Sequence, residues 1–136
     1  MDRLNGTEYG ITGLIFEIKR GATWQETFFF EGDLSNNKTL RGYLSKKQGG
    51  ERLAEFAFSQ IYFGDFTTED GDPLVGYTTF RASLPASVTS QLPTTSSKST
   101  SSQRAGKDYW ECDLECVSGN VVIPLVSAIV YVVGEC

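Results

Sequence analysis

The sequence predicts an all-β protein, and three observations lead to that prediction. Apolar and polar residues alternate in short segments, turn residues separate these segments, and no long segment has the periodicity of an amphipathic helix. About seven or eight short strands in such a pattern are typical of a single antiparallel β-sandwich or barrel. The length of 136 residues and the 40% content of hydrophobic residues fit one domain with a folded core.

The N-terminal region predicts an arm followed by two strands. Residues 1–13 contain three glycines and little alternation, so we expect a flexible N-terminal arm and a β-sandwich domain over residues 14–136. Two alternating segments then follow, joined by a turn at residues 20–22, and predict a hairpin-like pair of strands. Their apolar residues are Leu14, Phe16 and Ile18 in the first and Trp24, Phe28 and Phe30 in the second.

The middle of the chain predicts further strands separated by polar loops. Residues 39–47 alternate, and residues 52–63 keep a period of two at Phe56, Phe58 and Tyr62 although helix-forming residues are present. Residues 64–75 predict a polar loop, and residues 76–84 predict a strand. The inward residues of that strand are Thr78, Phe80, Ala82 and Leu84. A single helical turn is expected between Pro85 and Pro93.

The last third begins with a flexible Ser/Thr-rich loop, residues 94–107, followed by a predicted strand over residues 108–117. The inward residues of this strand are Trp110, Cys112, Leu114 and Cys116. A single core should bury side chains from four strands. These are Trp24, Phe28, Phe30, Phe80, Trp110, Leu114 and Val130.

The most apolar segment is Val121–Val133, which is shorter than the about 20 residues that span a bilayer. Six of its residues are Val and two are Ile, and β-branched residues favour a sheet. Because Pro124 and the pair Ser127–Ala128 interrupt the run, we expect two strands, over residues 120–126 and 129–133. A membrane anchor is the alternative interpretation.

The residue types present exclude most catalytic sites. The chain has no histidine, which removes Ser-His-Asp and Cys-His nucleophiles and histidine-based metal sites. No glycine-rich phosphate loop follows a predicted strand, and the acidic residues lie mostly in predicted loops and at outward positions. We therefore expect no enzyme, no catalytic residue, no cofactor and no metal centre, with calcium binding by the acidic loop 65–72 left open.

Charge and cysteine spacing limit the partners and the compartment. The net charge of −5 and the lack of long basic runs argue against a nucleic-acid partner. The first ten residues do not form a signal peptide, which indicates synthesis in a cytoplasm. On one strand, Cys112 and Cys116 would lie about 13 Å apart, too far for a disulfide. We expect both to be buried thiols.

Five motifs follow one another along the chain. "RGATW" follows the first apolar strand, "LRGYLSKK" ends a strand in positive charge, and "FRASLPASVTSQLP" joins a strand to a short turn. "DYWECDLE" is an aromatic strand with an Asp, and "GNVVIPLVSAIVYVV" is similar to a closing β-hairpin. Over residues 10–133 this ordered set resembles a family of small tailed-bacteriophage virion proteins. The chain departs from the family at Ser127–Ala128, where a Gly is usual, and in its longer Ser/Thr-rich insertion.

The resemblance implies an immunoglobulin-like β-sandwich without catalytic residues. Such a protein is a structural component of the tail, baseplate or fibre-attachment region, assembled with other virion proteins in many copies in the host cytoplasm. The candidate contact residues are Leu4 of the arm together with Tyr9, Tyr43 and Tyr109, since Tyr is enriched at interfaces. The alternative is that these tyrosines are ordinary outward aromatic residues of strands. A capsid decoration or cement protein and a carbohydrate- or receptor-binding module are the alternatives. The position on the particle, the copy number and the identity of the partner stay open.

Overall fold

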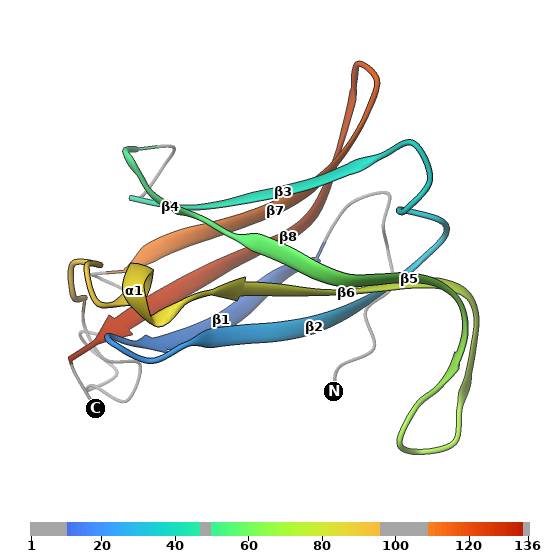
Figure 1. Cartoon of the computed structure of the whole chain (residues 1–136), viewed down its shortest axis with the longest axis horizontal. Helices are drawn as coiled ribbons and strands as arrows, with labels where there is room; N and C mark the ends of the chain where they lie inside the picture. The colour runs from blue at the N-terminus through green and yellow to red at the C-terminus, as the bar shows by residue number, and fades with distance from the viewer. Residues whose placement is uncertain (1–10, 47–49, 96–108, 135–136) are drawn as a thin grey trace.

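A computed structural model describes residues 11–46, 50–95 and 109–134 (Figure 1). In these residues the chain forms two packed β-sheets and one helical turn, which confirms the predicted all-β sandwich. The elements are β1 (Ile11–Lys19), β2 (Trp24–Glu31), β3 (Thr39–Ser45), β4 (Arg52–Glu55), β5 (Ala57–Thr67), β6 (Pro73–Leu84), α1 (Ala86–Thr89), β7 (Trp110–Ser118) and β8 (Val121–Val133).

The two sheets have the strand orders β1-β8-β7-β3-β4 and β2-β6-β5. Neighbouring strands are antiparallel with one exception: β1 and β8 run parallel, with Ile15 opposite Ile129. The prediction of a wholly antiparallel sandwich is therefore wrong at this pair. A parallel pair needs a long crossover, and here most of the chain lies between the two strands.

The predicted hairpin-like pair formed by the first two strands is also wrong, because β1 and β2 lie in different sheets. The chain turns at Gly21, whose φ of 85° is in the left-handed region, and β2 then pairs with β6. Phe16 of β1 packs edge-on against Trp24 and Phe28 of β2, with ring centroids 5.3 and 6.2 Å apart. The two alternating faces thus meet across the core instead of lying side by side in one sheet.

The predicted closing hairpin over residues 120–126 and 129–133 is in fact one continuous strand, β8. Ser127 and Ala128 continue the ladder opposite Asp113 and Cys112. The irregularity lies at Pro124 instead, where the register shifts so that one extra residue of β8 is accommodated. A bulge of this kind tolerates a proline, which cannot donate a ladder hydrogen bond. The hairpin of this region joins β7 to β8 through Gly119, whose φ is 60°.

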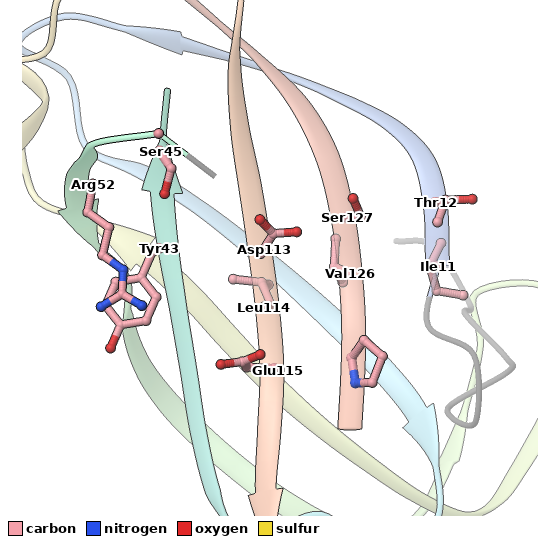
Figure 2. Close-up of a pocket in the computed structure, with 12 residues that line it drawn as sticks. Ile11, Thr12, Tyr43, Ser45, Arg52, Asp113, Leu114, Glu115, Val126 and Ser127 are labelled. Carbon is pink, nitrogen blue, oxygen red and sulfur yellow. The ribbon is translucent and has the colours of Figure 1, made fainter. Parts of the chain in front are cut away.

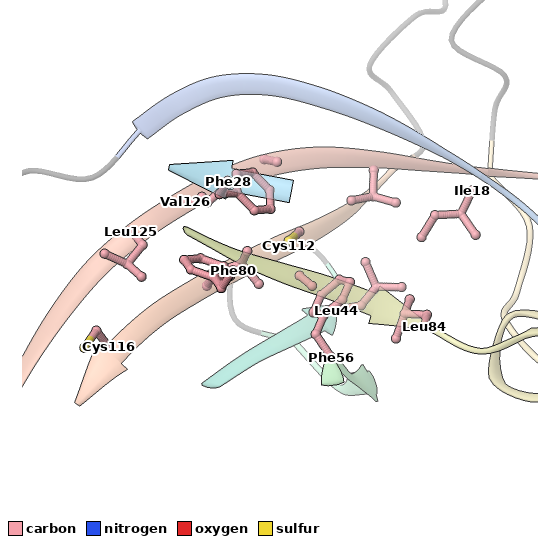
Figure 3. Close-up of a cluster of buried hydrophobic side chains, with 14 of the residues drawn as sticks. Ile18, Phe28, Leu44, Phe56, Phe80, Leu84, Cys112, Cys116, Leu125 and Val126 are labelled. Atoms are coloured by element: carbon pink, nitrogen blue, oxygen red, sulfur yellow. The ribbon is translucent and has the colours of Figure 1, made fainter. Parts of the chain in front are cut away.

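The core lies between the sheets and contains most of the side chains expected there (Figure 3). Five of the seven predicted core residues are at most 2% exposed: Phe28, Phe30, Phe80, Leu114 and Val130. The two tryptophans are only partly buried and pack at the rim of this core. The indole N–H of Trp110 donates a hydrogen bond to the carbonyl oxygen of Pro93 at 2.9 Å, which orients its polar edge away from the core.

The segment predicted as one strand over residues 52–63 divides at the buried Phe56, where the chain crosses from β4 in one sheet to β5 in the other. Most of the predicted loop 64–75 is strand, because β5 continues to Thr67 and β6 begins at Pro73. Gln60 has a φ of 52°, and the register with β6 shifts between Ser59 and Tyr62. This bulge reverses the later alternation, so Tyr62 does not share the inward side of Phe56 and is 60% exposed.

The ends of the predicted domain differ slightly from expectation. β1 begins at Ile11, so residues 11–13 of the predicted arm belong to the sheet, and residues 1–10 lie outside the described residues. Most of the predicted Ser/Thr-rich loop 94–107 also lies outside them. The predicted helical turn is present as α1. Its buried Thr89 hydroxyl donates to the Ala22 carbonyl at 2.8 Å, which ties this turn to the β1–β2 connection.

Candidate interaction surfaces

Of the four residues predicted to contact partners, the structure describes two. Tyr43 lies on β3, half-buried, and lines a groove over the outer face of the five-stranded sheet. Tyr109 does not line that groove: its ring packs edge-on against Tyr131, with centroids 6.5 Å apart. Leu4 and Tyr9 lie outside the described residues. The predicted set is therefore not brought together as one site.

The groove has a volume of about 390 Å³ and crosses all five strands of its sheet. Figure 2 shows Tyr43 and Arg52 on one side, Asp113 and Glu115 in the middle, and Ser127 on β8 beyond them. The floor is formed by β7 and β8, whose outward side chains are short or polar here. The groove is partly open and is lined by both apolar and polar side chains. The carboxylates of Asp113 and Glu115 lie in its middle, so it can take a polar or charged group of a partner.

Charge is arranged in a row along β7, where Glu111, Asp113 and Glu115 occupy successive outward positions. Arg41 of β3 forms an ion pair with Glu115. The Arg52 guanidinium lies over the Tyr43 ring, 3.7 Å from its centroid, so it covers one face of that ring.

Asp113 occupies the middle position of this row. Burial raises its pKa above the ordinary value, and the neighbouring carboxylates of Glu111 and Glu115 add to this effect. A hydrogen bond with Ser127 opposes it. The ionised form of Asp113 is therefore less stable here than in water. A positive charge that enters the groove would stabilise it.

The described residues contain no group of three or more Asp, Glu, Cys or His side chains placed to hold a metal ion. In the acidic loop 65–72, Asp65 accepts a hydrogen bond from the Gly76 backbone N–H at 3.0 Å. Asp72 N–H donates to the Thr68 hydroxyl at 3.0 Å. The first contact joins β5 to β6, and the second lies in the turn between these strands.

A second surface lies on β5, where three consecutive large hydrophobic residues are exposed. The exposed fractions are 39% for Ile61, 60% for Tyr62 and 49% for Phe63. In the described part of the chain, β5 is the last strand of its sheet, with β6 on one side and no strand on the other. Unpaired backbone groups and exposed apolar side chains together make an edge strand prone to pair with another chain.

A third surface is the β7–β8 hairpin, which projects at the top of the sandwich in Figure 1, on the opposite side from the β5–β6 hairpin at the bottom right. Val121 and Val122 near its tip are 59% and 46% exposed. Together with Leu34 they line an apolar groove of about 440 Å³ that has Glu31 and Asp33 at its margin.

The sequence analysis did not predict the β5 surface, because it continued the period of two past Gln60, where the strand has a bulge. The signal that was present is the run Ile61-Tyr62-Phe63 itself. Three adjacent large apolar residues cannot all face one core from a single strand, so at least one of them had to be outward.

Comparison of the sequence with models of known protein families finds no matching family, and comparison with curated proteins finds no match. Among the residues that the structure describes, no helix has the length and apolar character needed to cross a membrane.

Proposed function

We propose that the protein is a non-enzymatic structural component of a bacteriophage particle that acts by protein–protein assembly in the tail, baseplate or fibre-attachment region. The observation that carries the assembly role is the exposed apolar run Ile61–Phe63 on an edge strand of a small sandwich. Exposed apolar patches on a folded domain mark interaction sites. The ordered motifs that resemble small virion proteins supply the phage context.

Strand order supports an immunoglobulin-like classification as part of this proposal. In that fold, strands B, E and D lie together in one sheet and strands C, F and G in the other, and a C′ strand can add beside C. Here β2-β6-β5 takes the order B-E-D, and β8-β7-β3-β4 takes the order G-F-C-C′. An all-β sandwich with this order suits a rigid module that presents its edges and hairpins to neighbours.

The position of Trp110 also supports this classification. Immunoglobulin-like domains often place an aromatic residue near the start of strand F, two residues before the inward Cys, with its polar group bonded to upstream backbone. Trp110 lies two residues before the buried Cys112 and donates to the Pro93 carbonyl. The usual residue there is Tyr, and this chain has Trp in that role.

The proposed partners are other virion proteins, contacted in many copies within a symmetric assembly. A net charge of −5 supports protein partners over nucleic acid. Residues 1–10, with Leu4 and Tyr9, are proposed to add as a strand to a neighbouring chain, where backbone hydrogen bonds supply affinity and alternate side chains fill pockets. The proposed location is the virion, after assembly in the host cytoplasm.

Two experiments test the proposal. Mass spectrometry of purified particles from a host that carries the coding sequence should detect the chain at a fixed ratio to known virion proteins. Deleting residues 2–10 should leave the melting temperature nearly unchanged and reduce the amount of the chain in particles. Absence of the chain from particles would refute the virion role, and loss of folding in the deletion variant would show that this segment belongs to the core.

One observation favours the alternative of a carbohydrate- or receptor-binding module: the groove that contains Tyr43, Asp113 and Ser127. Against it, Arg52 covers one face of the Tyr43 ring, and both tryptophans pack at the core rim instead of presenting a free face to a sugar. A glycan array with the purified protein tests this alternative. A capsid decoration role uses the same surfaces, and gold-labelled antibodies on particles would distinguish the capsid from the tail.

A further inference from the structure

The strand β8 has neighbours on both sides along only part of its length. β1 begins at Ile11, which lies opposite Val126, so β1 covers β8 only from Val126 onwards. Figure 2 shows Ile11 and Thr12 of β1 level with Val126 and Ser127 of β8. Residues 121–124 pair with β7 on one side, and in the described part of the chain no strand lies on their other side. We call residues 121–124 the free edge of β8.

The geometry of the β7–β8 hairpin determines which backbone groups of the free edge point outward. A two-residue turn joins Ser118 to Val121, and a turn of this length closes on a hydrogen-bonded pair. The next pair, Val117 and Val122, is then a non-hydrogen-bonded pair, so the N–H and C=O groups of Val122 point away from β7. An extended segment of another chain can form hydrogen bonds with these groups.

Two grooves meet the free edge from opposite faces of the sheet. On the core-facing side lies the apolar groove of about 440 Å³, which is lined by Ile123, a residue packed against the core. On the outer side lies the groove of about 390 Å³ that contains Asp113 and Glu115, and Pro124 lines both grooves. Successive side chains of a strand point to opposite faces. A strand added beside the free edge therefore directs its side chains alternately into the two grooves.

We propose that the free edge of β8 accepts an extended segment of a partner protein in which apolar residues alternate with Lys or Arg. The apolar side chains cover the groove at Ile123, and a basic side chain crosses Pro124 towards Glu115, which lies opposite Pro124 on β7. The added strand and β7 are two strand spacings apart, about 10 Å, which a Lys or Arg and a Glu side chain span together. The inference rests on the proposed assembly function and names the docking edge and the chemistry of the partner.

The charges around the two grooves favour a basic partner. Acidic residues border both of them: Glu31 and Asp33 at the apolar groove, and Asp113 and Glu115 at the outer groove. The basic side chains beside the outer groove have partners within the fold, because Arg41 pairs with Glu115 and Arg52 lies over the Tyr43 ring. A Lys or Arg of the added segment is therefore attracted to this edge, and an acidic residue is repelled.

The chain's own residues 6–10 match this edge poorly, although they directly precede Ile11. Their sequence, GTEYG, contains no basic residue, and its two glycines offer no side chain to either groove. Continuing the register of Ile11 and Val126 backwards would place Glu8 beside Ile123, on the side of the apolar groove. A segment with apolar and basic residues in alternation is the better occupant.

A designed peptide tests the docking on the purified full chain. The probe is the capped peptide Val-Lys-Val-Lys-Val-Lys-Val, and the control peptide has Glu in place of each Lys. Titration followed by backbone amide NMR shifts should show binding of the Val/Lys peptide, with the largest shifts at residues 121–124. The Val/Glu peptide should not bind. Added salt should weaken binding of the Val/Lys peptide, since its charge contacts are partly exposed.

Charge variants test the outer groove. Asp113→Asn combined with Glu115→Gln should weaken binding of the Val/Lys peptide by roughly 10-fold, because two partly exposed charge contacts are lost. Glu17→Gln is the matched control, since Glu17 lies on β1 of the same sheet and lines neither groove. The affinity of this control should equal that of the unchanged chain.

Backbone variants at one position test strand addition itself. Val122→Pro removes the outward N–H without removing a hydrogen bond to β7, so the peptide should no longer bind. Val122→Thr keeps the N–H and a side chain of similar size, and the peptide should still bind. Thermal unfolding shows whether each variant is folded. If Val122→Pro does not fold, the charge variants and the two peptides still decide the question.

Several outcomes would overturn the inference. These are no binding up to about 1 mM peptide, equal affinity for the Val/Glu peptide, shifts confined to another edge, or full binding by folded Val122→Pro. Binding that appears only after deletion of residues 2–10 would make the arm the occupant. A dimer of the chain that excludes the peptide would make a second copy the occupant. The proposed function fails separately: peptide docking with no chain in particles would keep this inference and refute the virion role.

Discussion

Gly42 on β3 lies directly against Leu114, its cross-strand partner on β7. A Cβ atom at Gly42 would overlap Leu114 Cδ2, and it would lie 3.0 Å from the Asp113 carbonyl oxygen and 3.3 Å from Phe58 Cζ. Gly42 is buried and has no positive φ. The absence of a side chain is therefore required for close packing of the two sheets and not for backbone freedom.

Replacing Gly42 with Ala should lower the free energy of unfolding by about 1–3 kcal/mol, because overpacking a filled core forces neighbours out of position. Gly64→Ala is the matched control, since a Cβ at Gly64 on β5 meets no atom within 4 Å. Denaturant titration of both variants measures the difference. Equal stability of the two variants would contradict the packing argument.

Phe80→Ala should be more destabilising than Trp110→Ala, although tryptophan is the larger residue. Phe80 is 1% exposed and packs against the rings of Phe28, Phe30 and Phe58, so its truncation should cost about 3–5 kcal/mol. Trp110 is only partly buried, and its loss removes rim packing and one hydrogen bond. Thermal unfolding of the two variants decides the order, and a larger effect at Trp110 would count against its placement at the rim.

The thiols of Cys112 and Cys116 should react slowly with an aqueous alkylating reagent in the native protein. Both are buried, and burial raises the pKa of each thiol, so the reactive thiolate is scarce at neutral and mildly alkaline pH. All three cysteines, including Cys136 outside the described residues, are expected to remain thiols. Mass spectrometry after timed labelling measures this, with denatured protein as the control. Fast native labelling of both buried residues would refute their inward placement.

Asp113 should make the stability of the fold depend on pH in an unusual direction. Its folded pKa is raised above the value in the unfolded chain, chiefly by burial, so the folded state binds the proton more tightly. Ionised Asp113 therefore destabilises the fold at neutral pH, and this effect disappears as pH falls through the raised pKa towards the ordinary value near about 4. Because Asp113 is exposed, water screens this effect. Asp113→Asn should therefore raise the melting temperature at pH 7 by only a small amount and reduce the gain in melting temperature on acidification.

Asp33 provides a control of opposite sign. Hydrogen bonds from the Ser35 hydroxyl and the Ser35 backbone N–H lower its pKa, so its ionised form favours the folded state and that contribution is lost only below the ordinary pKa. Asp33→Asn should leave in place the stability gain that appears as pH falls from 7 towards the ordinary carboxyl pKa. If Asp113→Asn and Asp33→Asn give the same pH profile, the assignment to Asp113 is wrong.

Alternation of apolar and polar residues correctly predicted which side chains point into the core wherever a strand has no bulge. On β6, all four residues expected inward are buried, and on β7 Cys112, Leu114 and Cys116 are buried as predicted. Alternation failed on β5 because Gln60 adds a residue with a positive φ, which no side-chain pattern announces. On β8, the break was assigned to Ser127–Ala128, whereas a bulge beside Pro124 absorbs the irregularity.

Which strands pair with each other was less predictable than which side chains point inward, because pairing depends on segments far apart in the sequence. The pattern of β1 is compatible with any neighbour, and only the tertiary structure places it beside β8. The candidate sites were also hard to predict, because they combine residues from distant segments. Tyr43 was found as an outward tyrosine, whereas the groove around it needs β1, β7 and β8 together, and the exposure of Tyr62 depends on the bulge before it.

The parallel pairing of β1 with β8 has a consequence for the order of folding. Ile15 and Ile129 are opposite each other, so the five-stranded sheet closes only after nearly all of the described chain has been synthesised. The β5–β6 hairpin, whose contacts are local, can form much earlier on a growing chain. Because distant pairings form slowly, we expect the β2-β6-β5 sheet to collapse first and to expose its inner face until β8 arrives. During that interval a nascent chain depends on chaperones or on rapid release to avoid aggregation.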